Sequence, residues 1–215
     1  MILMLITDAR RACPDARTDR ALAVAMRAWV GDAIAAGVDL VQLREPWLSA
    51  RGLRQVTAEL VAAARGSSTR ILVNDRLDVA RAAGAHGVHL RDDGAAAARV
   101  RSWWPAPAVV GQSVHGAGVL SAVDYAVFGA VFGSGPKPPV GLAALTTVAR
   151  QSMVPVLAVG GVTPASVPAC RSAGAAGVAA ISIFLPPGAA PGALGPGEAV
   201  HALRAADRVT GQCHE

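Results

Sequence analysis

Short apolar runs alternate along this chain with longer segments whose apolar residues recur at helical spacing. The runs at 2–6, 70–73, 87–90, 125–128, 155–162 and 177–182 are almost wholly apolar, as is typical of strands buried on both faces of a parallel sheet. Further strands are expected at 38–45 and 108–110. Segments 17–36, 49–64, 77–83, 142–151 and 198–209 predict helices, and a poorly amphipathic helix should end near Trp103 and Trp104. The alternation predicts an α/β protein, a single-domain (β/α)₈ TIM barrel over residues 1–215.

Local signals support several of these helix boundaries. Gly37 is a standard left-handed terminator for the first helix, and Ser49 is a suitable cap for the second. Thr163 followed by Pro164 marks a helix start, and Gly174 closes that helix. Strand and helix signals therefore agree on the order of the elements.

One unit of the barrel is incomplete. Only residues 116–124 separate His115 from the sixth strand, so the fifth helix can be no more than a turn or two. An exposed apolar gap at that place would favour a homodimer. The segments 129–141 and 184–197 are rich in glycine and proline and are expected to form loops.

Composition narrows the function classes. The chain has 215 residues, 53% of them hydrophobic, which is enough for one large core. The net charge of +5 comes mostly from scattered arginines, and aromatics make up only 4%. A nucleic-acid groove is therefore unsupported, whereas a small phosphorylated ligand suits the charge. Few cysteines without metal spacing, and an apolar start too short to span a membrane, indicate a cytoplasmic protein with no membrane partner.

The ends of the last two strands predict a phosphate site. Gly160 and Gly161 close the seventh strand, where bare backbone N–H groups can approach an anion. Ile181 and Ser182 end the eighth strand in the same way. Paired phosphate loops occupy these positions in (β/α)₈ barrels. The alternative is two turns that need glycine for their geometry alone.

Polar residues also end the earlier strands. Gln42 and Arg44 should share one face of the second strand, where a bound anion would satisfy both; an ion pair with a neighbouring carboxylate would satisfy Arg44 equally. Asn74 and Asp75 end the third strand and could be no more than a helix cap.

The fourth and fifth strands and the loop after the sixth add further candidates. Asp93 lies where a metal or pyrophosphate site and a solvated turn are hard to distinguish. Ser113 and His115 alternate onto one side, and histidine is well suited to proton exchange near neutral pH. Lys137 could neutralise a phosphate or be solvated.

Taken in order, these strand ends carry a family resemblance. The motifs are Ile6-Thr7-Asp8, Gln42-Leu43-Arg44-Glu45, Asn74-Asp75-Arg76, Gly87-Val88-His89-Leu90, Gly111-x-Ser113-Val114-His115, Val131-Phe132 to Lys137, Gly160-Gly161-Val162 and Ile181-Ser182. Together they resemble the thiamine phosphate synthase/TenI superfamily over essentially the whole chain. The resemblance implies a (β/α)₈ barrel of thiamine biosynthesis. One branch joins hydroxymethylpyrimidine pyrophosphate to thiazole phosphate with Mg²⁺, and the TenI branch includes metal-independent thiazole tautomerases.

Departures from the synthase motifs favour the tautomerase branch. Pro46 stands where synthases have a pyrophosphate-binding lysine, and Gly94 stands where the second magnesium ligand belongs. Ser134-Gly135-Pro136-Lys137 replaces the synthase Thr-x-Thr-Lys, whereas Ser113-Val114-His115 resembles TenI. These changes weaken the case for a pyrophosphate with its cation. We therefore expect an isomerase without a cofactor.

On that interpretation, the partner is a phosphorylated thiazole and His115 is the general acid/base. Gly160, Gly161, Ile181 and Ser182 bind its phosphate. The expected substrate-binding residues are Gln42, Arg44, Asn74, Ser113 and Lys137.

Two alternatives remain. A thiamine phosphate synthase, a transferase, would need Mg²⁺, with Asp75 and, after a loop shift, Asp93 as its ligands. A catalytically inactive barrel would keep its phosphate loops and serve as a ligand-binding or regulatory protein.

Overall fold

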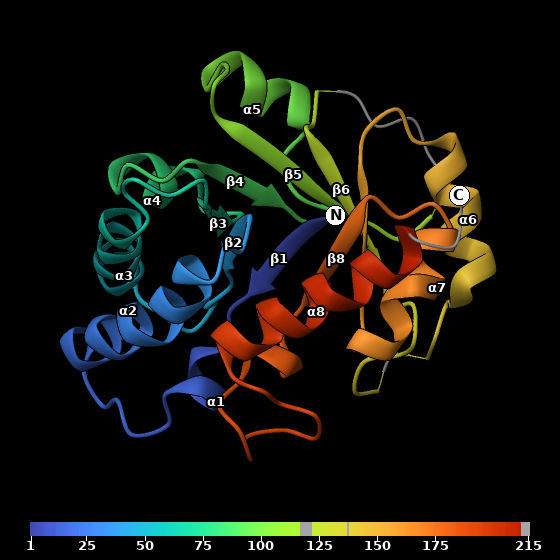
Figure 1. Cartoon of the computed structure of the whole chain (residues 1–215). Helices are drawn as coiled ribbons and strands as arrows, with labels where there is room; N and C mark the ends of the chain where they lie inside the picture. Colours follow the sequence, from blue (N-terminus) through green and yellow to red (C-terminus); the bar gives the residue numbers. More distant parts are fainter. Residues whose placement is uncertain (117–121, 137, 212–215) are drawn as a thin grey trace. The chain divides into compact units, whose positions relative to one another are not determined.

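Eight parallel strands form a closed barrel in sequence order, which confirms the predicted α/β TIM barrel. The computed structural model describes residues 1–116, 122–136 and 138–211. The strands are β1 (Ile2–Ile6), β2 (Leu40–Leu43), β3 (Arg70–Asn74), β4 (Gly87–Leu90), β5 (Val109–Val114), β6 (Tyr125–Gly129), β7 (Val156–Val159) and β8 (Gly177–Ala180). Figure 1 follows the alternation of strands and helices from blue to red.

Helices connect the strands. They are α1 (Ala9–Ala12), α2 (Asp19–Ala35), α3 (Ala50–Ala63), α4 (Leu77–Ala82), α5 (Ala97–Trp103), α6 (Gly141–Gln151), α7 (Val167–Ser172) and α8 (Pro196–Gly211). Two short 3₁₀ turns, η1 (Pro164–Ser166) and η2 (Ser182–Phe184), follow β7 and β8. Among the described residues, no helix is both long enough and apolar enough to cross a bilayer.

The chain forms two compact units. One comprises Met1–Met4, Leu90–Ala180 and His201–Glu215, and the other comprises Leu5–His89 and Ile181–Val200. This division does not test the prediction of a single domain over residues 1–215, which stays a prediction. The strands on which the candidate residues lie are distributed over both units.

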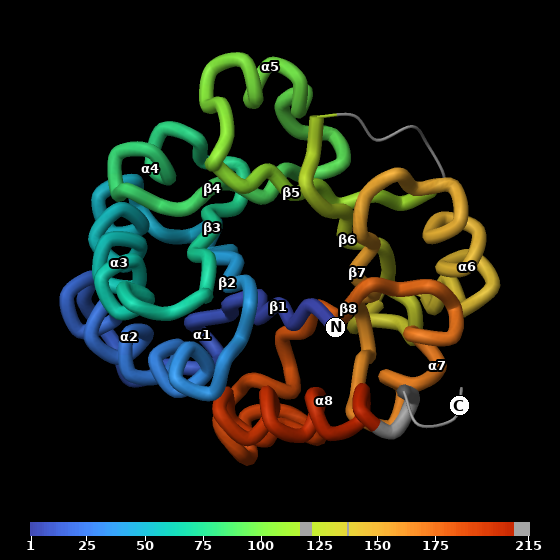
Figure 2. Tube along the Cα trace, turned by 45° about the horizontal axis from the view of Figure 1, so that its top comes forward, coloured from blue at the N-terminus to red at the C-terminus, as the bar shows by residue number. Residues whose placement is uncertain are grey.

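In the unit that contains β2 and β3, α2 and α3 lie side by side (Figure 2). Both helices begin at the expected kind of cap, because the Thr18 hydroxyl accepts from the Ala21 N–H and the Ser49 hydroxyl from the Gly52 N–H, each at 3.1 Å. Gly37 follows α2 with a φ of 88°, the left-handed conformation expected of a terminator. The N-terminal caps of α2 and α3 are therefore encoded locally.

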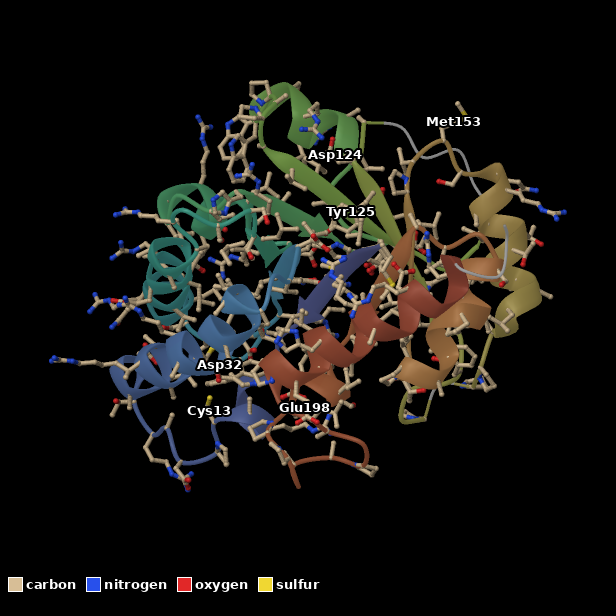
Figure 3. All side chains as sticks on the ribbon, in the orientation of Figure 1. Cys13, Asp32, Asp124, Tyr125, Met153 and Glu198 are labelled. Carbon is tan, nitrogen blue, oxygen red and sulfur yellow. The ribbon has the colours of Figure 1, made fainter. Side chains whose placement is uncertain are left out.

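In the other unit, β5 and β6 approach very closely at one glycine. Gly111 pairs with Tyr125, and a Cβ built on Gly111 would lie 2.1 Å from Cζ of the tyrosine ring. Tyr125, labelled in Figure 3, is 3% exposed. The glycine of the Gly-x-Ser-Val-His motif thus has a packing reason, since any side chain would overlap the ring.

Several boundaries differ from the sequence prediction. The second strand ends at Leu43 instead of residue 45, and the fifth continues to Val114 instead of ending at residue 110. The short helix α1, which was not expected, begins directly after the Asp8 cap. The residues expected to form a shortened fifth helix include 117–121, which lie outside the described part of the chain; Gly116 and residues 122–124 form no helix. The homodimer suggested by that gap stays a prediction.

Candidate functional site

The ends of β2 and β3 bring three predicted residues into one chain of hydrogen bonds. Gln42 Nε2 donates to Asn74 Oδ1 at 2.8 Å, and Asn74 Nδ2 donates to Asp75 Oδ2 at 3.3 Å. Neighbouring parallel strands present their carboxyl ends at the same edge, so the contact follows from the topology. The structure therefore joins Gln42 and Asn74, predicted to bind substrate, with Asp75, predicted to bind metal only in the synthase alternative.

Gln42 carries an unsatisfied acceptor. Its side chain is 3% exposed, and its Oε1 is buried without a hydrogen-bond partner among the described residues. A buried carbonyl oxygen that lacks a donor costs free energy, which a bound ligand with an N–H or O–H group would recover. The site thus has a specific place for a hydrogen-bond donor.

Asp75 holds an unusual backbone conformation. Its φ is 56°, in the left-handed region that aspartate tolerates better than most residues. Its N–H donates to the carbonyl of His89 at 2.9 Å, which fixes the turn. The structure gives α4 the cap Arg76, without a side-chain capping bond. The alternative that Asn74 and Asp75 serve only as a cap is therefore not supported.

A second network surrounds Glu45. Its Oε1 accepts from the Thr7 hydroxyl at 2.5 Å and from the Ala9 N–H at 2.9 Å, and its Oε2 accepts from Trp47 Nε1 at 3.0 Å. Burial raises the pKa of the Glu45 carboxyl, although these three hydrogen bonds lower it in part. Glu45 was part of the sequence motif but had no predicted role. The only indication of a role in the sequence was the presence of a carboxylate directly after a buried strand.

Cys13, labelled in Figure 3, lies at the end of α1 near this network. Burial raises the pKa of its thiol, and the charge of Glu45 raises it further. The cysteine is consequently held as a thiol rather than a reactive thiolate.

Arg44 differs from Gln42 in burial, and the prediction that the two side chains share one face stays a prediction. Gln42 is buried within β2, whereas Arg44 lies after the strand ends at Leu43 and is exposed. Its backbone N–H donates to the Thr7 hydroxyl at 3.1 Å. Among the described residues, the Arg44 side chain forms no ion pair, so the alternative of a neighbouring carboxylate finds no support.

His89 lies on β4 and is 1% exposed. Burial lowers its pKa to about 4, and the positive charge of Arg44 adds to the decrease. The imidazole is thus neutral at physiological pH. In the register of β3 and β4, His89 pairs with Asn74, so a neutral histidine lies beside the Gln42–Asn74–Asp75 chain.

In the other unit, Asp93 is engaged by an arginine. Arg91 Nε and Nη2 donate to its two carboxylate oxygens at 3.0 and 2.7 Å. These bonds, and to a small extent the charge of His115, lower the pKa of the Asp93 carboxyl. Ser113 is half-buried within β5, whereas His115 is exposed beyond its end.

The glycines after β7 have two reasons to be glycine. Gly160 and Gly161 have φ values of 93° and 67°, and a Cβ on Gly160 would lie 2.6 Å from Ala130 Cα. Backbone conformation and packing are therefore enough to explain glycine at these two positions, as the turn alternative expects. The phosphate role of Gly160 and Gly161 stays a prediction. Ser182 begins η2 after Ile181, and Lys137 lies outside the described residues.

The aspartate oxygens that follow the strands are of the chemical type that binds Mg²⁺. Mg²⁺ takes hard oxygen ligands and is commonly bound by one or two carboxylates together with substrate phosphates. In one unit, Asp75, directly after β3, supplies such oxygens. In the other unit, both carboxylate oxygens of Asp93 accept from Arg91. Among the described residues, no group of three or more acidic, histidine or cysteine side chains forms a cage for a metal. A cation here would depend on phosphate oxygens of a substrate.

Comparison with known proteins places this chain in a family. The family model described as thiamine monophosphate synthase matches residues 3–184. The thiamine-phosphate synthase of Roseiflexus sp. strain RS-1 is 34% identical over 213 residues, covering 95% of this chain and 84% of that protein. The corresponding protein of Laribacter hongkongensis is 37% identical over 158 residues, covering 70% and 75%.

A solved structure agrees with these relatives. The thiamine phosphate pyrophosphorylase from Pyrococcus furiosus has a TM-score of 0.78 and 25% identity, covering 97% of this chain and 96% of that one. The names of these relatives contradict the predicted tautomerase and isomerase and fit the transferase alternative instead. The role of His115 as the general acid/base was predicted for the tautomerase reaction alone. The chain belongs to the thiamine monophosphate synthase family.

Proposed function

We propose that this protein is a thiamine-phosphate synthase, a transferase that joins hydroxymethylpyrimidine pyrophosphate to thiazole phosphate with Mg²⁺. The observation that carries the proposal is the match to synthases at 34% and 37% identity over most of their length. In the reaction, the bond between the pyrimidine methylene carbon and the pyrophosphate oxygen breaks. The thiazole nitrogen forms the new bond to that carbon, and pyrophosphate leaves with the bonding electrons.

The buried acceptor of Gln42 supports recognition of the pyrimidine. An aminopyrimidine carries N–H donors, and one of them would satisfy Oε1, which has no partner among the described residues. The bond from Gln42 Nε2 to Asn74 holds the amide in the orientation that presents Oε1. We therefore assign Gln42 to the pyrimidine ring and Asn74 to keeping Gln42 in place.

The charged residues around the same strands suit the diphosphate. Arg44 is an exposed guanidinium without an ion pair among the described residues, and its donors match phosphate oxygens. Asp75 is the residue that would hold Mg²⁺, and Asp93, whose carboxylate is bound by Arg91, stays a prediction. When bound, Mg²⁺ neutralises the negative charge of the departing pyrophosphate.

The phosphate of the thiazole is assigned to the backbone after β7. Gly160 and Gly161 adopt left-handed conformations in which successive N–H groups can face an anion. Ile181 and Ser182, Lys137 and Ser113 stay predictions for substrate binding. None of these assignments requires a proton carrier at His115.

The test is a direct assay of product. Purified protein with both substrates and Mg²⁺ should form thiamine phosphate and pyrophosphate in equal amounts, measured by chromatography and a pyrophosphate-coupled assay. Removal of Mg²⁺ by EDTA should abolish both products, and added Mg²⁺ should restore them. Absence of thiamine phosphate at saturating substrates would reject the proposal, and binding of thiazole phosphate without turnover would favour the inactive barrel.

A variant of Asp75 connects the assay to the structure. Asp75→Asn keeps a residue that tolerates the left-handed backbone and removes the charge. We expect the Mg²⁺ concentration for half-maximal rate to rise about tenfold or more, since a carboxylate ligand is lost, while the melting temperature stays close to that of the unmodified protein. Asp92→Asn, a charge change in the exposed turn after β4, is the matched control and should leave the Mg²⁺ requirement unchanged.

A further inference from the structure

The charge that the synthase motif places at the position of Pro46 has a candidate replacement in this fold. We propose that Arg10 binds the diphosphate of the substrate, held in position by Trp47 and Glu45. The inference rests on the proposed synthase function, and it adds a binding residue that lies outside the motifs of the family resemblance.

The location is set by two neighbouring strands. Arg10 is on α1, which begins three residues after β1 ends, and Trp47 follows β2 by four residues. Because β1 and β2 are adjacent parallel strands, both segments emerge at the carboxyl edge, where active sites of such barrels lie. Arg10 is therefore at the correct end of the barrel.

A cation–π contact fixes the guanidinium. Arg10 Cζ lies 4.7 Å from the centroid of the Trp47 ring. Stacking uses the face of the guanidinium and leaves its N–H donors at the rim. Among the described residues, the Arg10 side chain forms no hydrogen bond or ion pair, whereas its neighbour Arg11 approaches Asp8 at 3.7 Å. The donors of Arg10 are consequently available for an anion.

Both sides of this stack are tied to one buried carboxylate. Trp47 Nε1 donates to Glu45 Oε2 at 3.0 Å, and the N–H of Ala9, the residue before Arg10, donates to Oε1 at 2.9 Å. Glu45 is 3% exposed and cannot move without breaking both contacts. Ring and helix are thus preorganised, so less conformational freedom is lost when an anion binds.

Through Thr7, the same carboxylate also holds the backbone of Arg44. Thr7 donates to Glu45 and accepts from the N–H of Arg44. Glu45 is therefore a positioning residue for two arginines, Arg44 through Thr7 and Arg10 through Trp47. An arginine binds phosphate oxygens in a fork, which a lysine at the position of Pro46 would not do.

The experiment compares two adjacent arginines. Arg10→Ala should raise the KM for hydroxymethylpyrimidine pyrophosphate about tenfold, since a charge-assisted contact is lost, and leave the KM for thiazole phosphate unchanged. Arg11→Ala removes the same charge from the same short helix and should behave like the unmodified protein. Arg10→Lys should recover part of the affinity, and Trp47→Leu should weaken binding in the same direction. An unchanged KM in Arg10→Ala would overturn the inference.

Binding of inorganic pyrophosphate separates this inference from the proposed reaction. In calorimetric titrations with Mg²⁺ present, the unmodified protein and Arg11→Ala should bind pyrophosphate equally, and Arg10→Ala about tenfold more weakly. Equal binding by all three, or no binding by the unmodified protein, would reject the role of Arg10. Arg10-dependent binding without formation of thiamine phosphate would retain this site and reject the synthase reaction.

Discussion

The Thr7 hydroxyl donates a 2.5 Å hydrogen bond to Oε1 of Glu45 while accepting the N–H of Arg44 at 3.1 Å. One hydroxyl thus links the end of β1 to the residues after β2. Thr7 and Glu45 are both almost completely buried. A buried polar group without a partner lowers the free energy of unfolding, so the two hydrogen bonds of Thr7 should contribute to stability as well as to the site.

Thr7→Val keeps the shape of the side chain and removes both hydrogen bonds. We expect the free energy of unfolding to fall by about 1–3 kcal/mol, because a buried carboxylate and a backbone N–H each lose a partner. Thr7→Ser retains the hydroxyl and should lose less. Urea unfolding at pH 7 measures both. Equal stability of the valine variant and the unmodified protein would show that the network contributes nothing.

Gln42→Met tests the unsatisfied acceptor. The methionine fills a similar volume and removes the buried, unsatisfied Oε1. Removal of this oxygen should offset the loss of the hydrogen bond to Asn74, so the free energy of unfolding should change by less than about 1 kcal/mol. The KM for the pyrimidine substrate should nevertheless rise about tenfold, since its donor has no acceptor. Chemical denaturation and steady-state kinetics provide the two readouts. A large loss of stability with an unchanged KM would contradict the assignment.

His89 predicts a specific pH dependence of stability. Its pKa in the folded protein is about 4, against 6.5 for an ordinary histidine, so the unfolded chain binds the proton more readily between these values. Stability should therefore fall as the pH decreases from about 6.5 towards 4, by about 3 kcal/mol from this residue.

The measurement is urea unfolding across that pH range in the presence of EDTA. His89→Gln should remove this part of the slope and leave the contributions of the carboxylates. If the difference between the two proteins does not depend on pH, the imidazole does not remain neutral in the fold.

Gly160→Ala combines backbone strain with overlap. The left-handed φ costs about 1–2 kcal/mol for a residue with a Cβ, and the overlap with Ala130 adds about 1–3 kcal/mol. Gly188→Ala is the matched control, because its φ is 86° and its Cβ would meet nothing within 4 Å. Denaturant unfolding of the two variants should show a clearly larger loss at residue 160. Equal losses would show that the close approach to Ala130 has no energetic consequence.

The sequence was sufficient for the fold because its signals are local. The runs at 2–6 and 87–90 coincide with β1 and β4, and Ser49 caps α3 through its own hydroxyl. Apolar runs and caps depend on nearby residues, so they can be read without the tertiary structure. The ends of β2 and β5 were misplaced, because strand length depends on pairing with neighbours.

The site was only partly predictable. Gln42, Asn74 and Asp75 were predicted from the strand ends, and hydrogen bonds join them in the structure. Glu45 received no role because its partners Thr7 and Ala9 lie after β1 and on α1, far away in the sequence. The choice of reaction was wrong for a related reason. The proline at residue 46 was weighed as a lost charge, although the relatives at 34% and 37% identity are synthases. A substitution within one motif therefore does not determine the chemistry of a site assembled from several.

Because Gly111 packs directly against the Tyr125 ring, the residue at each of these two positions limits the size of the residue at the other. Any side chain at 111 would need the ring at 125 to be smaller, and a smaller residue at 125 would leave a cavity unless 111 grew to fill it. Across related barrels these two positions should covary, and protein engineers who alter one of them will need to redesign the other.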